Sequence, residues 1–434
     1  MIRSQQHFRL ANKISSLLAN FLLFMNGRIR LLLHGFLLLY IIIRISIWKT
    51  GSSNVYIPGT PIETINLNCD TVFNGGRDIS KYKHWSFDYS SIERELYESD
   101  EVCDTIRRYF VFEDIPLSEE EANYPLAYGF LIYKDIVQVM LEFSIFYHPQ
   151  NAYCIMVDQG ANRKFKNFIA KLPSCFNNTA TFVNLDHPWK YYQYLSGADL
   201  PLRTNLEMVR IMIALNGSIN TDVEEFETDR YRLMEGIHPP VPLYKSAMSV
   251  AIPRRAAKFM SKSKKVKALL TYLSETWVPD ESFWTTVAGN AVLIKAPGSF
   301  RARDILWLRK HLTMTPNGYH AVDHVGTSYI GRYQVWEWQK PCFGRIASWS
   351  CVFGVLDMPE VVRRPELVAH KVYLDQQPAA YLCLLKEIRR RSHSPIEFDA
   401  SSYAEMPTVE LSNGKRITEL KHPDWLMRSS FYRH

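Results

Sequence analysis

The chain has 434 residues, of which 47% are hydrophobic and 22% charged, so it is long and apolar enough to bury a large core and is not disordered by composition. Its formal net charge of +7 matches the seven Lys and Arg of the first 50 residues, which hold no Asp or Glu. When those seven are subtracted from the 51 basic residues, the rest of the chain has 44 basic and 44 acidic residues. No global basic field remains, so we expect no nucleic-acid partner.

The first predicted element is an apolar stretch that follows basic residues. LLLHGFLLLYIII occupies 31–43, and continuing to Trp48 gives 18 residues with one cation, Arg44, near the end. A membrane span needs about 20 such residues. We therefore expect a signal anchor, with a cleaved signal peptide or an amphipathic helix as the alternatives. The expected organisation is a basic cytoplasmic segment, an anchor helix, a stem and a luminal body, at 1–30, 31–48, 49–68 and 69–434.

The body begins with a predicted helix at 94–110, in which Glu and Arg are interleaved, and continues with an alternation of strands and helices. Strand-length apolar runs at 126–133 and 152–158 are each followed by a segment with helical spacing, at 134–147 and 162–172. This order predicts an α/β fold with a mixed, mostly parallel sheet flanked by helices. Asp158 ends the second strand, and ligands of such sheets bind at the carboxyl ends of the strands. Asp158 is therefore a candidate binding residue, although a turn or helix-capping role fits its position equally well.

The second half offers few familiar chemical motifs. A helix is predicted at 254–275, a turn at Pro279 and another helix from residue 280, followed by aromatic-rich segments at 328–338 and 349–356. There is no glycine-rich phosphate loop, no serine nucleophile elbow and no HExxH. Three ligand-type residues lack a further partner at matching spacing, so a structural role is favoured and no metal site is expected: His320, Asp323 and His324.

Seven cysteines occur without a CxxC pair, which disfavours a zinc ribbon or a thioredoxin-like site. Wide spacing behind a membrane anchor favours luminal disulfides, and the odd count leaves one cysteine over. Asn177 and Asn216 each begin a glycosylation sequon. Together these features favour a luminal body.

Four ordered segments carry a family resemblance: YPLAYGFLIYKD at 124–135, YHPQNAYCIMVD at 147–158, LSGADLPLRTN at 195–205 and VPDESFW at 278–284. They resemble the core-2/I-branching β-1,6-N-acetylglucosaminyltransferases, and the resemblance runs from about Cys69 to Cys383. It implies a GT-A-like fold and a type II protein of the Golgi membrane. It also implies that N-acetylglucosamine is moved from UDP-N-acetylglucosamine, with inversion, in β-1,6 linkage onto an O-glycan core such as the GalNAc of core 1.

Inversion requires a carboxylate behind the attacking hydroxyl. The resemblance assigns this base to the Glu of Pro279-Asp280-Glu281, whereas the residues alone favour a helix-capping role. No Asp-x-Asp motif occurs, and the resemblance implies that fixed cations rather than a metal hold the leaving UDP. Lys371 matches one of these cations. The expected arginine position holds Ser348, and Arg345 is the candidate replacement.

For the acceptor, the resemblance implies contacts from aromatic and charged side chains, which match Arg230, Tyr333 and Trp336 approximately. Core packing is as good an explanation for the two aromatic residues. The resemblance also implies three disulfides, with Cys154 left unpaired: Cys69–Cys383, Cys103–Cys175 and Cys342–Cys351.

One segment departs from the family. The resemblance implies a helix that carries the partner of Cys154, yet only three residues, 186–188, separate strands predicted at 179–185 and 189–197. Parallel neighbours need a crossover of about a dozen residues. We therefore expect an internal deletion near 185–189. Three alternatives stay open: a catalytically impaired or incomplete variant, a protein O-xylosyltransferase-like enzyme, and a luminal lectin.

Overall fold

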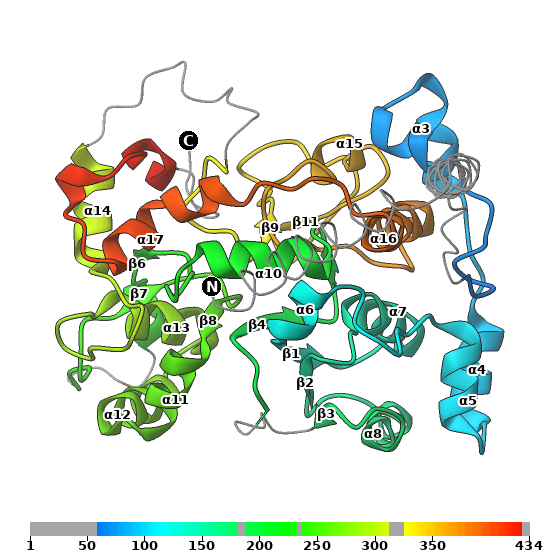
Figure 1. Ribbon diagram of the computed structural model, residues 1–434, viewed down its shortest axis with the longest axis horizontal. Coiled ribbons are helices and arrows are strands. Elements are labelled where there is room, and N and C mark those ends of the chain that lie inside the picture. The colour runs from blue at the N-terminus through cyan, green and yellow to red at the C-terminus, as the bar shows by residue number, and fades with distance from the viewer. Residues whose placement is uncertain (1–58, 181–186, 232–236, 312–324, 428–434) are drawn as a thin grey trace, which may run out of the picture. The chain divides into compact units, whose positions relative to one another are not determined.

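The computed structural model describes residues 59–180, 187–231, 237–311 and 325–427 (Figure 1). Within these ranges, no helix combines the length and the apolar character needed to cross a bilayer. The anchor predicted at 31–48 lies outside the described residues. The residues at 320–324, where no metal site was expected, also lie outside the described residues.

A five-stranded sheet in the order β3-β2-β1-β4-β8 forms the centre of the body. The first four strands are parallel, and β8 runs antiparallel to β4. The near-continuous apolar sequences of β1 and β2 fit strands that are covered on both faces. The predicted mixed, mostly parallel sheet is thereby confirmed. Its strands are β1 (Leu126–Ile132), β2 (Ala152–Val157), β3 (Thr179–Ala180), β4 (Tyr191–Ser196) and β8 (Ala251–Pro253).

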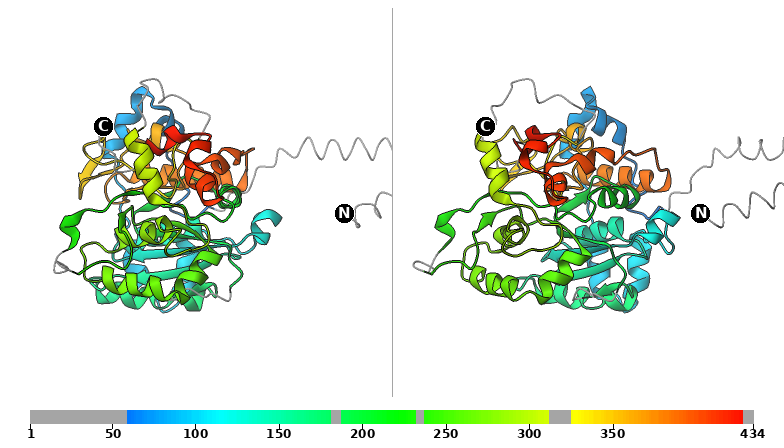
Figure 2. Two further views of the ribbon diagram at one scale, coloured as in Figure 1. Left: turned by 90° about the vertical axis from the view of Figure 1, so that its left-hand side faces the viewer. Right: turned by 60° about the vertical axis from the view of Figure 1, so that its left-hand side comes forward.

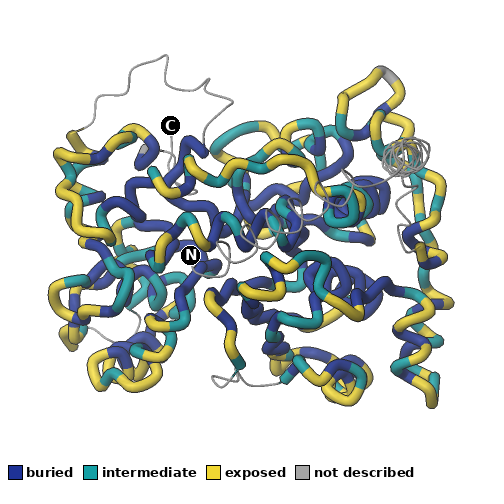
Figure 3. Tube along the Cα trace, viewed as in Figure 1, coloured by how far each residue is buried: buried dark blue, intermediate teal, exposed yellow. Residues whose placement is uncertain are grey.

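Helices flank the sheet. Every residue of α7 (Ile136–Phe146) is buried, and Figure 3 shows α7 and β1 in dark blue along most of their length. Figure 2 shows that the C-terminal helices α16 (Pro378–His393) and α17 (Pro407–Ser412) gather on one side of the body. The helices α11 (Arg254–Lys262) and α12 (Lys264–Leu273) lie on the opposite side.

Two predicted helices are each divided in the structure. The segment 94–110 contains the end of α4 (Ser90–Glu98) and the whole of α5 (Val102–Tyr109), and 254–275 contains α11 and α12. Ser263 ends α11 and also caps α12, because its hydroxyl accepts a hydrogen bond from the Val266 amide at 3.4 Å. A serine offers the backbone such a bond at a helix start, and a helical period alone does not reveal the break.

The strands β3 and β4 are not neighbours, because β2 and β1 lie between them. Of the strand predicted at 179–185, only its first two residues are described. Three strand spacings of about 4.8 Å separate β3 from β4, whereas the ten residues from 181 to 190 span about 33 Å when extended. The short connection is therefore long enough for this topology. The expected crossover of about a dozen residues applies to parallel strands that are adjacent in the sheet, and β3 and β4 are not adjacent.

Three small sheets carry the strands that surround the candidate site. One joins β5 (Asp199–Pro201), β12 (Val368–His370) and β9 (Tyr333–Gln334), and the others are two-stranded. The two-stranded sheets are the pair β6 (Glu224–Glu225) with β7 (Tyr244–Lys245) and the hairpin of β10 (Arg345–Ala347) with β11 (Ser350–Val352). The other described helical elements are α3 (Cys69–Asn74), η1 (Arg77–His84), α6 (Glu119–Asn123), α8 (Arg163–Ile169), α9 (Leu172–Cys175), α10 (Asn205–Ala214), η2 (Thr228–Tyr231), α13 (Asp280–Gly289), α14 (Ala302–His311), α15 (Met358–Val361), η3 (Ser401–Glu405), η4 (Ile417–Glu419) and η5 (Pro423–Met427).

Three disulfides join the cysteine pairs that the resemblance implied. They connect α3 to α16, α5 to α9, and the segment before β10 to β11. The remaining cysteine, Cys154, is free and buried, and burial raises its pKa to about 11. Cys154 is therefore a neutral thiol at pH 7 and unreactive in this setting.

Candidate active site

A cleft of about 710 Å³ opens between β6, β7, the start of α13, α14 and the β10–β11 hairpin. This volume is in the range of sites for small molecules. Acidic and basic side chains line one part, and three tryptophans line another. Of the residues predicted from sequence, Glu281, Arg230 and Trp336 are in this lining.

Glu281 is the second residue of α13, and its carboxylate is held at one oxygen only. Its Oε2 accepts a hydrogen bond from Nη2 of Arg230 at 2.7 Å, while Oε1 makes no hydrogen bond with any described residue. The side chain is 22% exposed. No side chain caps the N-terminus of α13, so Glu281 does not perform the capping role that the residues alone favoured. Its backbone is fixed by Ser246, whose amide donates to the Glu281 carbonyl at 2.6 Å.

Arg230 connects Glu281 to a second carboxylate. Its Nε donates to Oε2 of Glu227 at 2.7 Å, and Lys245 donates to the other oxygen of Glu227. Burial alone would raise the pKa of Glu227, but the bonds from Lys245 and Arg230 outweigh it and lower that pKa. Charges therefore alternate along the row Lys245, Glu227, Arg230 and Glu281, and each charge has an opposite neighbour.

The remaining charges of the cleft are also paired. Arg309 of α14 contacts Glu224 of β6 at 3.1 Å, and Lys310 contacts Glu225. Four carboxylates thus face four cations in the lining. The cleft has no net formal charge.

Tryptophans line the part of the cleft near the hairpin. The rings of Trp336 and Trp338 stack with centroids 5.3 Å apart and planes at 10°. Trp349 lies next to this segment, because the Glu337 amide donates to the Trp349 carbonyl at 3.0 Å. Of these three tryptophans, only Trp336 was predicted from the sequence, although Trp338 and Trp349 lie in the aromatic-rich segments at 328–338 and 349–356.

Tyr333, the other aromatic candidate, belongs to the core. It is buried, its ring stacks on Phe353 at 5.3 Å and 3°, and its hydroxyl donates to Glu360 at 2.7 Å. It does not line the cleft. Tyr333 therefore packs in the core, which was the alternative to a contact with the acceptor.

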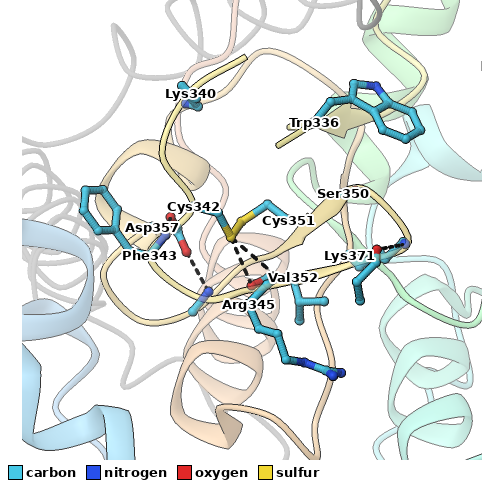
Figure 4. The surroundings of a disulfide bond; sticks show 12 residues. Trp336, Lys340, Cys342, Phe343, Arg345, Ser350, Cys351, Val352, Asp357 and Lys371 are labelled. Carbon is cyan, nitrogen blue, oxygen red and sulfur yellow. Dashed lines mark hydrogen bonds between the residues drawn. A yellow bond between two sulfur atoms is a disulfide. The ribbon is translucent and has the colours of Figure 1, made fainter. Parts of the chain in front are cut away.

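Lys371 and Arg345 form a separate cationic region beside the hairpin. Lys371 follows β12, and its Nζ donates to the Ala347 carbonyl at 2.7 Å (Figure 4). Burial lowers the pKa of Lys371, and the charges of Arg332 and Arg345 lower it further. Neither Lys371 nor Arg345 forms an ion pair with a described residue. Two positive charges therefore lack counterions within the described part of the chain.

A buried ionic cluster lies under Lys371. Asp199 accepts a hydrogen bond from Arg332 at 2.7 Å, and Nδ1 of His370 lies 2.8 Å from its other oxygen. Burial lowers the pKa of His370 to about 4, with Arg332 acting in the same direction, so the ring is neutral at pH 7. The Arg332 and Asp199 charges balance each other. The uncompensated charge of the region therefore comes from Lys371 and Arg345.

The other predicted residues lie elsewhere. Asp158 is exposed at the end of β2 and accepts a hydrogen bond from the Gly160 amide at 2.7 Å, which is a turn contact. Asn177 and Asn216 are exposed, as a glycosylation acceptor must be. Asp357 lies close to the sulfur atoms of Cys342 and Cys351, but those sulfurs are bonded to each other and offer no thiolate to a metal (Figure 4).

Comparison with known proteins shows similarity to one family. Residues 126–184 and 179–324 match the sequence model described as Core-2/I-Branching enzyme. This part of the chain is similar to the Core-2/I-branching enzymes. It is 24% identical over 388 residues to the Homo sapiens β-1,3-galactosyl-O-glycosyl-glycoprotein β-1,6-N-acetylglucosaminyltransferase, covering 75% of this chain and 86% of that protein. It is 26% identical over 341 residues to the Homo sapiens N-acetyllactosaminide β-1,6-N-acetylglucosaminyl-transferase, covering 67% and 77%. The matched model and the names of these relatives indicate a glycosyltransferase.

The residues predicted from sequence fall into two groups and a remainder. Glu281, Arg230 and Trp336 share the neutral cleft. Lys371 and Arg345 lie near each other, since the charge of one lowers the pKa of the other. The remainder, Asp158 and Tyr333, belongs to neither group. The structure thus separates a carboxylate with an open oxygen from a pair of uncompensated cations.

Proposed function

We propose that this chain moves N-acetylglucosamine from UDP-N-acetylglucosamine, with inversion, in β-1,6 linkage onto an O-glycan core, such as the GalNAc of a Gal-GalNAc unit. The names of its relatives support the class of reaction. The observation that carries the assignment is the setting of Glu281. One carboxylate oxygen is fixed by Arg230, and the other is open in a cleft lined by tryptophans.

The open Oε1 of Glu281 is the proposed base. It removes the proton from the acceptor hydroxyl as that oxygen attacks the anomeric carbon of the donor sugar. The new carbon–oxygen bond forms on the face opposite the bond to phosphate, and that bond breaks with its electron pair leaving on UDP. The cleft has no net charge, so it suits an uncharged acceptor. A nucleotide diphosphate would need an excess of positive charge, which this cleft does not offer.

Lys371 and Arg345 are proposed to hold the departing diphosphate. They lack counterions within the described residues, and fixed cations stabilise negative charge that develops on a leaving group. Under this proposal transfer needs no metal ion, and the body has a GT-A-like donor fold. Asp158, at the carboxyl end of β2, stays a candidate for contact with the donor.

We also propose that the chain is a type II protein of the Golgi membrane, anchored by residues 31–48 with the body in the lumen. Three disulfides support an oxidising compartment. The exposed sequons at Asn177 and Asn216 are compatible with a luminal body. Glycosidase digestion of the protein from intact Golgi vesicles tests both points, and an unglycosylated, protease-accessible body contradicts them.

The central test incubates the full chain with UDP-N-acetylglucosamine or UDP-xylose, a core-1 acceptor or a serine peptide, and EDTA. We expect N-acetylglucosamine transfer to core 1 that survives EDTA. Glu281→Gln should lower kcat by about 10²- to 10⁴-fold, the usual contribution of a general base. Asp280→Asn, in the same helical turn, is the matched control and should keep most of the activity. A full rate in Glu281→Gln contradicts the mechanism, and xylose transfer to serine favours the xylosyltransferase alternative.

An impaired variant of the enzyme is the second candidate. A cavity of about 70 Å³ lies next to Cys154, where the two family matches meet. Buried polar atoms of Asn178, Thr179 and His187 make no hydrogen bond there with any described residue. Each such atom costs about 1–3 kcal/mol, which lowers stability. Sequencing the transcript across residues 176–190 tests this candidate, since an in-frame insertion with a cysteine would identify the chain as incomplete.

A further inference from the structure

Two adjacent helices, α11 and α12, carry a concentrated positive charge outside the cleft. The segment 254–274, which forms them, contains no Asp or Glu. Each helix buries apolar residues against the body, such as Met260 of α11 and Leu269 of α12, so its charged residues lie on the solvent side. We name the exposed cations of the two helices the basic face: Arg255, Lys258, Lys262, Lys264, Lys265 and Lys267.

The charges of the basic face have no counterions within the described part of the chain. Arg255 donates to the Gly217 carbonyl at 3.1 Å and Lys265 to the Leu293 carbonyl at 2.7 Å, and neither bond neutralises a charge. Like charges one helical turn apart, such as Lys258 and Lys262, destabilise a helix. The chain after residue 50 is neutral by formal count, so this accumulation is local. An unpaired row of cations that does not stabilise the fold points to an anionic partner.

Helix α13 connects the basic face to Glu281. α12 packs against α13, and Figure 1 shows α11 and α12 below α13, on the same side of the view as β6 and β7. Lys265 contacts Leu293, which follows the C-terminal end of α13, whereas Glu281 is in its first turn. Eight residues separate Glu281 from Gly289, the last residue of α13. At a rise of about 1.5 Å per residue, they span about 12 Å. The basic face is therefore about one short helix away from the proposed base.

The place where the chain enters the body argues against a membrane as the partner. The first described residues are held by α16, because Glu63 pairs with Arg389 at 3.1 Å and Lys386 donates to the Ile65 carbonyl. Figure 2 shows α16 on the side of the body opposite α11 and α12. The proposed N-terminal anchor is thus joined to the body far from the basic face. A soluble polyanion fits this position better than a lipid surface does.

We propose that the basic face binds an acidic polypeptide segment of the acceptor glycoprotein, outside the cleft that receives its glycan. The inference rests on the proposed function in one respect, that the glycan in the cleft is attached to a polypeptide. The cleft has no net charge, so the basic face rather than the cleft attracts an acidic protein. An extended chain spans about 3.3 Å per residue, so acidic residues about four to eight positions from the glycosylated residue would reach the basic face.

The test measures the binding of two fluorescent glycopeptides to the full chain by anisotropy. Both carry Gal-GalNAc on one threonine, and they differ in a run of Glu or of Gln about four to eight residues away. We expect the Glu peptide to bind about three- to tenfold more tightly, as several exposed ion pairs allow. The triple variant Lys262→Ala, Lys264→Ala, Lys267→Ala should lose this preference and bind the Gln peptide within twofold of the wild-type affinity. High salt should also remove the preference, because it screens exposed charges.

Two further variants separate charge from folding and from position. Replacing the same three lysines by arginine keeps the charges and should keep the preference. The matched control Arg163→Ala, Lys164→Ala, Lys171→Ala removes three exposed cations on and after α8, and it should also keep the preference. A free Gal-GalNAc glycoside has no peptide and should bind all these variants equally.

Equal binding of the Glu and Gln peptides, or a preference that survives in the alanine variant, overturns the proposal. A membrane role for the basic face would give no peptide preference. It would instead give tighter attachment to phosphatidylserine than to phosphatidylcholine vesicles, which the alanine variant loses. Because binding is measured, a chain that prefers the Glu peptide but transfers no sugar would contradict the proposed function and leave this inference standing.

Discussion

The cleft around Glu281 and the region around Lys371 share the β10–β11 hairpin, yet they handle charge in opposite ways. In the cleft, four carboxylates are matched with four cations. Beside it, Lys371 and Arg345 keep their charges uncompensated within the described residues. Lys371 keeps its charge half-buried, at a cost that appears in its lowered pKa. Holding two cations together without a counterion is unfavourable for the free protein, so an anionic ligand is expected to fill that role.

From this contrast we propose different substrates for the two regions. A neutral cleft with exposed aromatic rings suits sugar rings, while uncompensated cations suit a diphosphate. The β10–β11 hairpin borders both regions, so the groups of the cleft and the cations beside it lie close together but remain separate.

The largest effect is expected from Lys371→Ala. Under the proposed mechanism, loss of this cation removes stabilisation of the leaving UDP, and kcat/KM should fall by about 10²- to 10³-fold, as for other fixed electrostatic groups. Acceptor binding, measured by NMR titration, should stay within twofold. Lys258→Ala, on the exposed surface of α11, is the control and should leave both quantities unchanged. Weakened acceptor binding in Lys371→Ala with unchanged donor kinetics would reverse the assignment of the two regions.

Arg230→Met should have the next largest effect. A hydrogen bond between charged groups contributes about 1.5–3 kcal/mol, so kcat should fall by about 10- to 100-fold. Arg230 fixes one carboxylate oxygen of Glu281 so that the other stays open to the cleft, and without it the base is poorly oriented. Arg230→Lys should restore part of the rate. If Arg230 only binds the acceptor, as the sequence resemblance suggested, KM rises instead and kcat stays unchanged.

The sequence predicted the parts of this arrangement that depend on local pattern. The apolar runs at 126–133 and 152–158 are of strand length, and both form strands of the predicted parallel sheet. Glu281 was found only through the resemblance of VPDESFW, because a lone Asp-Glu pair at a helix start is more often a cap. The structure brings it to Arg230, 51 residues earlier in the chain, and a spacing pattern does not encode such a contact.

The aromatic residues show what the sequence left open. Tyr333 and Trp336 are three residues apart in one aromatic segment, yet Tyr333 packs in the core and Trp336 lines the cleft. Their difference comes from tertiary packing against Phe353 and Glu360, which local sequence does not show. Trp349 lines the cleft from the two-residue loop between β10 and β11. The sequence alone did not reveal this, because the register of the hairpin comes from the structure.

Because His370, next to Lys371, is buried, we expect the folded chain to lose stability in acid. Its pKa is about 4 in the folded chain, against an ordinary value of 6.5. Between these values the unfolded chain binds more protons, so the free energy of unfolding should fall as pH drops from 6.5 to 4. One group contributes at most about 1.4 kcal/mol per pH unit. Asn keeps an N–H near Asp199 but does not titrate, so urea unfolding of His370→Asn should show a smaller pH slope. His238→Asn, at an exposed position, should keep the wild-type slope.

Arg345→Ala should have the smallest effect on activity among these substitutions. Arg345 is exposed, so its interaction with a diphosphate is screened by solvent and is expected to contribute about 1 kcal/mol or less. The KM for UDP-N-acetylglucosamine should rise by about three- to fivefold, which corresponds to that energy, and the difference should shrink at high salt. Ser348→Arg, introduced into Arg345→Ala, places an arginine at the position that the resemblance implied, and it should restore donor binding if the two positions serve one function. No rise in KM for Arg345→Ala at low salt would leave Lys371 as the sole cation for the diphosphate and remove Arg345 from the donor side.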